Sequence, residues 1–258
     1  MAPTTEQVER IRGKLRLDTP LIAVYDAAPG PDFEPLVRAT ARACCFAYWP
    51  RWVKGETLAI ERGDDSFTQP THGCPGAQRA FGLARGGYPP YMAHFLTDGV
   101  GAPSGEGLKA TPELAQAYLE RSRPPVLRGD SVLLGPLRAE RWDAVRSVTF
   151  FADPDRLSAL MTLAAFWSSE PDEIVATFSS GCGLMLRELE QQPRDRAVLG
   201  ATDIAMRKYI PRELLALSVS PARFEKMLGV PDGVFLDKEW WGDLLAGIPA
   251  GARGGGPR

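Results

Sequence analysis

Apolar residues recur along this chain at two different spacings, and the spacings predict both helices and strands. Over Glu6–Leu17 they return every three or four residues, as on one face of a helix, and a threonine ahead of the segment can cap its first turn. Leu21–Tyr25 is instead a short continuous apolar run, which predicts a buried strand. Similar runs or alternating stretches predict further strands at Glu56–Arg62, Val132–Leu134, Ser147–Phe151, Ile174–Phe178 and Leu214–Val219.

Capping residues followed by proline mark the start of three further helices. Serine, threonine and aspartate can accept from the first backbone N–H groups of a helix, and proline is favoured at its first position. The Ala-rich segment Glu34–Tyr48 is expected to be partly helical, and a short helix is expected over Tyr91–Leu96. The capped helices are predicted to run from Pro112 to Arg121, from Pro154 to Trp167 and from Pro221 to Leu228.

Strands alternate with helices over the whole sequence. This order predicts an α/β or α+β fold, in which helices pack on a mixed sheet. No linker divides the chain, and an apolar content of 44% is ample for a core, so we expect a single domain over residues 1–246. The Gly/Pro-rich tail over residues 247–258 is expected to be disordered.

Charge and hydropathy exclude two kinds of partner. The net charge is −2 and both signs are interspersed, so there is no basic surface of the kind that nucleic acids or anionic membranes select. No stretch approaches the roughly 18 apolar residues that span a bilayer, and the amino-terminal segment does not have the pattern of a signal peptide. We therefore expect a cytoplasmic protein that binds neither nucleic acid nor membrane. In a reducing compartment its four cysteines are expected to be thiols, catalytic groups or metal ligands.

Two of the cysteines lie where a glycine-flanked turn leads into an apolar helix. Cys74 is in THGCPGAQRAFGL, and Cys182 follows a predicted strand in SSGCGLM. The first N–H groups of a helix have no partner within it and the helix dipole adds positive charge, so a cysteine there tends toward the metal-binding thiolate. The two strand–Gly-Cys–helix units suggest two related halves whose cysteine turns face each other. Backbone N–H groups that can donate to a thiolate or to cluster sulfides are those of Gly73, Gly181 and Gly183.

Spacing alone does not define a metal site. The cysteines lack the CxxC spacing that is typical of zinc fingers and ferredoxins. Cys44 and Cys45 are adjacent, so at most one of them is expected to be a primary ligand. If three cysteines converge, they would hold either an iron–sulfur cluster with one open iron position or a zinc ion whose fourth ligand is water or His72.

Two other functions remain open from the residues. One is a cofactor-free binding protein with cysteines in its core, in which the loop Gly99–Gly107 closes over a small organic ligand. The other is a thiol-redox enzyme in which two cysteines form a disulfide. Neither GxGxxG nor GxxxxGK[ST] is present, which argues against a nucleotide site. The expected partners are a small molecule or a redox partner protein, and Trp240-Trp241 is either a packing contact or a contact in a homo-oligomer.

The order of several short motifs resembles a known family. These motifs are Cys45 with Gly55 ten residues later, CPGA followed by FGL, a helix capped by Asp-Pro, the GCG helix start, and VLGATDIAMRKY. Over about Leu21–Leu228 they resemble the DUF169 family of bacterial and archaeal proteins. The resemblance implies no reaction, but it implies a cytoplasmic α/β protein whose family cysteines are Cys45, Cys74 and Cys182.

The two Gly-Cys helix starts lead to the main hypothesis, a metal or iron–sulfur binding protein with a redox or ligand-activating role. Its group would be a cluster such as 4Fe–4S, with zinc as the alternative, held by the three family cysteines. In the metal-free protein we expect Cys74 to be the most reactive thiol. Pro75 fits the first turn of a helix, and the neighbouring glycines leave the backbone open to solvent.

Overall fold

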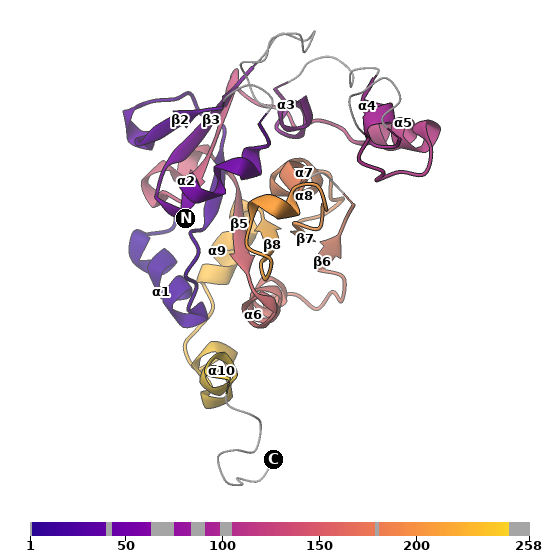
Figure 1. Cartoon of the computed structure of the whole chain (residues 1–258). Coiled ribbons are helices and arrows are strands. Elements are labelled where there is room, and N and C mark those ends of the chain that lie inside the picture. Colours follow the sequence, from indigo (N-terminus) through magenta and orange to yellow (C-terminus); the bar gives the residue numbers. More distant parts are fainter. Residues whose placement is uncertain are drawn as a thin grey trace.

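The computed structural model describes residues 2–39, 43–62, 75–83, 91–98, 105–178 and 181–247. At its centre is one mixed sheet with the strand order β2-β3-β4-β1-β5-β8-β7-β6, with helices packed on it (Figure 1). The predicted α/β fold class is confirmed. The strands are β1 (Ile22–Tyr25), β2 (Leu36–Arg38), β3 (Thr57–Glu61), β4 (Ser131–Pro136), β5 (Val145–Ala152), β6 (Ile174–Ala176), β7 (Ala197–Gly200) and β8 (Leu215–Val219).

The helices lie before, between and after these strands. The α-helices are α1 (Thr5–Leu15), α2 (Trp49–Val53), α3 (Pro75–Ala80), α4 (Tyr91–Phe95), α5 (Pro112–Arg121), α6 (Pro154–Ala165), α7 (Gly181–Met185), α8 (Arg187–Glu190), α9 (Pro221–Leu228) and α10 (Glu239–Leu245). The 3-10 helices are η1 (Pro31–Phe33), η2 (Cys45–Tyr48), η3 (Ala139–Ala144), η4 (Arg207–Tyr209) and η5 (Phe235–Asp237).

Side-chain caps fix where several of these helices begin. At α1, the Thr4 hydroxyl accepts from the N–H of Gln7, and the Gln7 side chain accepts from the N–H of Thr4. The predicted caps Thr111, Asp153 and Ser220 each accept from a backbone N–H in the first turn. In all three helices proline follows the cap, as the sequence predicted.

Both faces of the sheet are buried, each under its own hydrophobic cluster. Along β5, Phe150 belongs to the cluster formed with α1, α6 and α9, whereas Phe151 belongs to the cluster formed with η2, α2, α3 and α7. Along β1, Tyr25 and Val24 divide in the same way. Because neither face meets water, the central strands read as continuous apolar runs rather than as alternating ones.

The sheet consists of two halves with the same internal order. In the first half, β2 is parallel to β3, β3 is antiparallel to β4, and β4 is antiparallel to β1. The second half repeats this arrangement with β6, β7, β8 and β5 in the places of β2, β3, β4 and β1. Antiparallel pairing of β1 with β5 joins the halves. The connection from β2 to β3 carries Cys45, and the equivalent connection from β6 to β7 carries Cys182. The sequence predicted that Cys74 and Cys182 occupy equivalent positions in the two halves. In the structure, the residue at the position equivalent to Cys182 is Cys45.

Other sequence expectations were less accurate. The segment Glu34–Tyr48 was expected to be partly helical. Among its described residues, Leu36–Arg38 forms strand β2, and the helical part is the 3-10 helix Cys45–Tyr48. Helix α10 was not predicted. The two adjacent tryptophans of this helix have different environments. Trp241 is buried and donates to the carbonyl of Lys14 at 2.9 Å, whereas Trp240 is 58% exposed. Residues 248–258 of the predicted disordered tail lie outside the described residues.

Candidate functional site

Two cysteines that are far apart in the sequence meet over one face of the sheet. Cys45 is the first residue of η2, and Cys182 is the second residue of α7. Both are buried in the same hydrophobic cluster, and the thiol of Cys45 is hydrogen-bonded with the thiols of Cys182 and Cys44. All three are thiols rather than disulfides, and Cys44 is the least buried of them. The meeting follows from the topology, because both connections lie on the same face and η2 packs against α7.

The surroundings of Cys45 keep its thiol protonated. Hydrogen bonds with Cys182 and Cys44, together with burial, raise the pKa of Cys45 well above its ordinary value. A thiol must lose its proton to ligate a metal ion, so metal binding here would release protons. The raised pKa of Cys45 leaves little of its thiolate near neutral pH.

Aromatic side chains surround the cysteine pair. Phe46 lies between Trp52 and Phe151, with ring centroids 5.8 Å and 6.1 Å away, and Trp49 packs on Phe151 at 4.8 Å. All of these rings are buried in the same cluster as Cys45. The aromatic residues that follow the cysteine pair in the sequence therefore form a rigid apolar wall, and the low dielectric of such a wall strengthens polar interactions inside it.

The start of α7 is held by a carboxylate that the sequence interpretation did not single out. Asp203 Oδ2 accepts from the N–H of Gly181 at 3.1 Å, while its Oδ1 accepts from the N–H of Ala205 at 2.9 Å. Gly181 is also closely packed, since a Cβ atom there would lie 2.7 Å from Met206 Cγ and 2.9 Å from Phe46 Cε2. The N–H of Gly181, which was expected to face a cofactor, is thus used by Asp203. The Thr-Asp pair within VLGATDIAMRKY was the available signal, because aspartate two residues before an N–H commonly caps a turn.

A second carboxylate lies near this cap. Burial raises the pKa of Glu106, and the negative charge of Asp203 adds to the effect. Glu106 belongs to the loop that was expected to close over a ligand, of which residues 99–104 lie outside the described residues. The described end of that loop therefore reaches the neighbourhood of the α7 cap.

The third cysteine expected at the site, Cys74, lies outside the described residues, as do His72 and Gly73. Helix α3 begins at Pro75, directly after Cys74 in the sequence, and packs against α7. Its residues Ala77 and Ala80 belong to the cluster that holds Cys45 and Cys182. Pro75, which follows Cys74 in the sequence, thus begins the helix α3 that contacts α7, the helix of Cys182.

Within the described ranges, no group of three or more His, Cys, Asp or Glu side chains is arranged to hold a metal ion. The same part of the chain has no helix that is long and apolar enough to cross a membrane.

Comparison with family models matches residues 10–229 to DUF169, described as uncharacterised ArCR. The match covers most of the chain, including both halves of the sheet and all four cysteines, and it confirms the resemblance drawn from the short motifs. Comparison with curated proteins and with solved structures finds no match.

Proposed function

The chain belongs to the DUF169 family, and we propose that it binds an iron–sulfur cluster or a single metal ion through Cys45, Cys74 and Cys182. The observation that carries the proposal is the hydrogen bond between the Cys45 and Cys182 thiols. Two buried thiols from separate connections then lie within reach of one metal centre. The group would supply electron transfer, or it would activate a ligand at an open coordination position.

The packing of α3 supports Cys74 as the third ligand. Helix α3 begins one residue after Cys74 in the sequence, and it contacts α7, the helix that carries Cys182. Three thiolates form a soft ligand set that suits iron–sulfur clusters or zinc. They leave one position for an external ligand, or for His72 in the zinc version.

Cys44 is assigned a secondary role. Its thiol is hydrogen-bonded with that of Cys45, but it is less buried. Adjacent residues seldom direct both sulfur atoms to one ion, so Cys45 is the ligand of the pair and Cys44 adjoins it. Near a metal, the Cys44 thiol would donate a hydrogen bond to the Cys45 thiolate and so adjust its basicity, without binding the metal itself.

Metal analysis after anaerobic purification tests the proposal. We expect iron with acid-labile sulfide, or about one zinc per chain. The metal content should fall strongly in Cys45→Ser, Cys74→Ser and Cys182→Ser and persist in Cys44→Ser, with folding of each variant checked by circular dichroism. A folded protein that contains neither iron nor zinc, and takes up neither on reconstitution, would falsify the proposal.

The same contact between thiols favours a second candidate, a thiol-redox protein. With oxidised glutathione, Cys45 and Cys182 would lose two protons and two electrons to form one disulfide, while the oxidant becomes two glutathione thiols. Peptide mass mapping after mild oxidation would detect a Cys45–Cys182 link. Formation of this link in protein that contains no metal would favour the redox function, and its absence under strong oxidation would exclude it.

A further inference from the structure

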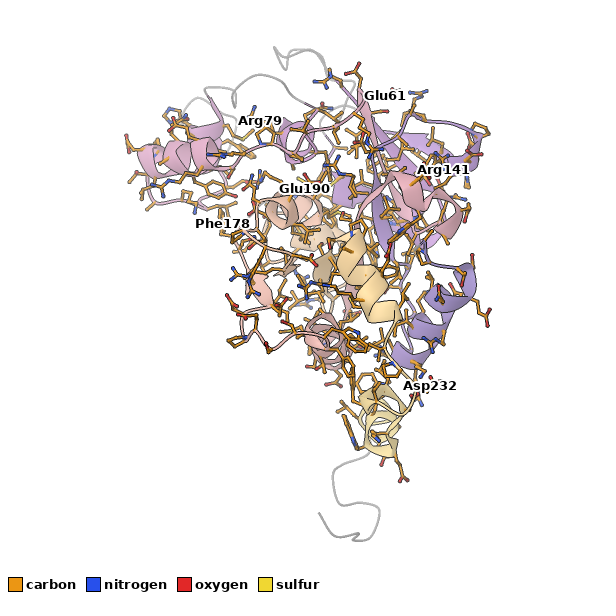
Figure 2. The ribbon with its side chains drawn as sticks, turned by 180° about the vertical axis from the view of Figure 1, so that it is seen from behind. Glu61, Arg79, Arg141, Phe178, Glu190 and Asp232 are labelled. Atoms are coloured by element: carbon orange, nitrogen blue, oxygen red, sulfur yellow. The ribbon has the colours of Figure 1, made fainter. Side chains whose placement is uncertain are left out.

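A cleft lined by arginines lies between α8 and the segment that follows α5. Its volume is about 610 Å³, within the usual range for small-molecule sites. Figure 2 labels Glu190 on α8, the helix that forms one wall of the cleft. The opposite wall is the segment after α5. The lining residues are Arg121, Arg123, Pro124, Pro125, Val126, Arg146, Arg187, Glu190 and Gln191.

The lining of this cleft carries more positive than negative charge, although the net charge of the protein is −2. Four arginines line it, and Glu190 is the one carboxylate among the lining residues. In the part of the chain that the structure describes, no carboxylate forms an ion pair with Arg121 or Arg123, and both side chains are exposed. Their charges are therefore available to a ligand, whereas the exposed Arg38 and Arg51 each pair with a glutamate.

The other two arginines are fixed in place before any ligand arrives. Arg187 is 2% exposed and is held by the Glu188 carboxylate at 2.7 Å and by the Tyr118 hydroxyl at 3.3 Å. The Arg146 guanidinium donates to Asp26 at 2.8 Å, and it also pairs with Glu190. Guanidinium groups that are already oriented lose little conformational entropy on binding, and their planar donors match carboxylate and phosphate oxygens.

The segment after α5 gives the cleft an apolar side. Val126 is 83% exposed, and it follows Pro124 and Pro125 along the same wall. The Val126 carbonyl accepts from Arg146 at 3.0 Å, and the Gln191 side chain donates to the carbonyl of Arg123. These two bonds fasten the segment to β5 and to the residue that follows α8.

We propose that this cleft binds a small organic anion with at least two negative charges and a short apolar body. Arg121 and Arg123 would contact the charged groups, and Val126 would contact the apolar part. A phosphate ester and a dicarboxylate share this chemistry. The site is separate from the cysteines, so it stands whether or not the chain binds a metal.

Calorimetric titration of the full-length protein with glycerol 3-phosphate and with succinate, at low ionic strength, tests the proposal. We expect at least one of them to bind, and to bind more tightly than the monovalent anion acetate. Binding of the phosphate alone or of the dicarboxylate alone would identify the class. In the double variant Arg121→Gln/Arg123→Gln, affinity should fall at least about tenfold, since each lost hydrogen bond was to a charged group.

Removal of two positive charges elsewhere is the matched control. Lys54 and Arg212 are exposed cations outside the cleft, and the variant Lys54→Gln/Arg212→Gln should bind within about twofold of the wild type because exposed distant charges are largely screened. Thermal unfolding should show all variants folded. The proposal is overturned if neither divalent anion binds, or if the control variant loses as much affinity as the cleft variant.

Discussion

At the scale of single residues, the thiols of Cys44 and Cys45 are adjacent in the sequence but differ in their surroundings. Cys45 is 2% exposed and its pKa is raised by hydrogen bonds with two other thiols and by burial, whereas Cys44 is partly exposed. The thiolate is the form that reacts with alkylating agents. The two cysteines should therefore differ in reactivity, although their sequence positions suggest no difference.

We expect iodoacetamide to modify Cys44 at least about tenfold faster than Cys45 in the reduced, metal-free protein at pH 8, because a raised pKa leaves little Cys45 thiolate. Peptide mass spectrometry over time measures both rates, and denatured protein is the control in which the rates converge. Cys74 remains the thiol predicted to react first of all. Equal rates for Cys44 and Cys45 in the folded protein would contradict the buried position of Cys45.

Gly181 offers a test of packing around the cysteine pair. Alanine there would place its Cβ within 3.0 Å of Phe46 and Met206, so Gly181→Ala should destabilise the protein by about 1–3 kcal/mol. A Cβ atom at Gly13, inside α1, would have no other atom within 4 Å, and Gly13→Ala should stabilise the protein by up to about 1 kcal/mol. Urea unfolding compares the two. A neutral Gly181→Ala would show that Phe46 and Met206 move aside easily.

At the scale of elements, local interactions were predictable from the sequence and pairing between distant segments was not. The starts of α5, α6 and α9 follow from caps that bond within one turn, which is why their first residues were predicted. Strand β2 has only three residues and is defined by its parallel pairing with β3. The partner of Cys182 likewise depends on the strand order, and no spacing between cysteines encodes that order.

The connection between β3 and β4 contains α4 and α5, which form a small hydrophobic cluster of their own. This connection contacts the segment after β6 at Phe178 (Figure 2). The Lys109 ammonium lies 3.9 Å from the Phe178 ring centroid and 4.7 Å from that of Tyr118, and the Tyr118 hydroxyl donates to the carbonyl of Phe178 at 3.2 Å. Phe178 thus links the β3–β4 connection to the segment that leads into α7.

We therefore expect Phe178→Ala to speed amide hydrogen exchange in residues 105–121 while exchange in β1 and β5 stays unchanged. The lost cation–π contact is worth only about 1 kcal/mol at a partly exposed site, which is too little to unfold the sheet. Leu244→Ala is a matched control, because Leu244 is 43% exposed, Phe178 is 42% exposed, and Leu244 lies in α10. Exchange mass spectrometry that finds residues 105–121 equally protected in both variants would contradict this role of Phe178.

At the scale of the whole molecule, two buried acids among the described residues contribute to the response to alkaline pH. The pKa of Cys45 is raised, and burial raises the pKa of Tyr25, whose hydroxyl donates to the carbonyl of Pro136 and accepts from the N–H of Arg138. In the unfolded chain these groups lose protons near pH 8.5 and pH 10, respectively. Above those values the folded protein binds more protons than the unfolded chain, so stability falls as pH rises.

The free energy of unfolding of the reduced, metal-free protein should therefore be level from about pH 7 to 8, decline above about pH 8.5 and decline more steeply above about pH 10. Urea titrations across this range measure it. In Cys45→Ala the decline that begins near pH 8.5 should be smaller, whereas the steeper one should remain. A decline of the same size in that variant would assign it to another group.

The position of β1 in the sheet has a consequence for synthesis on the ribosome. Strand β1 is the first strand of the chain, yet its neighbours β4 and β5 begin only at Ser131 and Val145. At ~5–20 residues translated per second, the nascent chain carries the unpaired apolar segment Ile22–Tyr25 for about 6–24 s before β5 is made. An unpaired strand edge of this kind is a template for pairing with other chains. A chaperone that binds the growing polypeptide early would shield this segment until both neighbouring strands emerge.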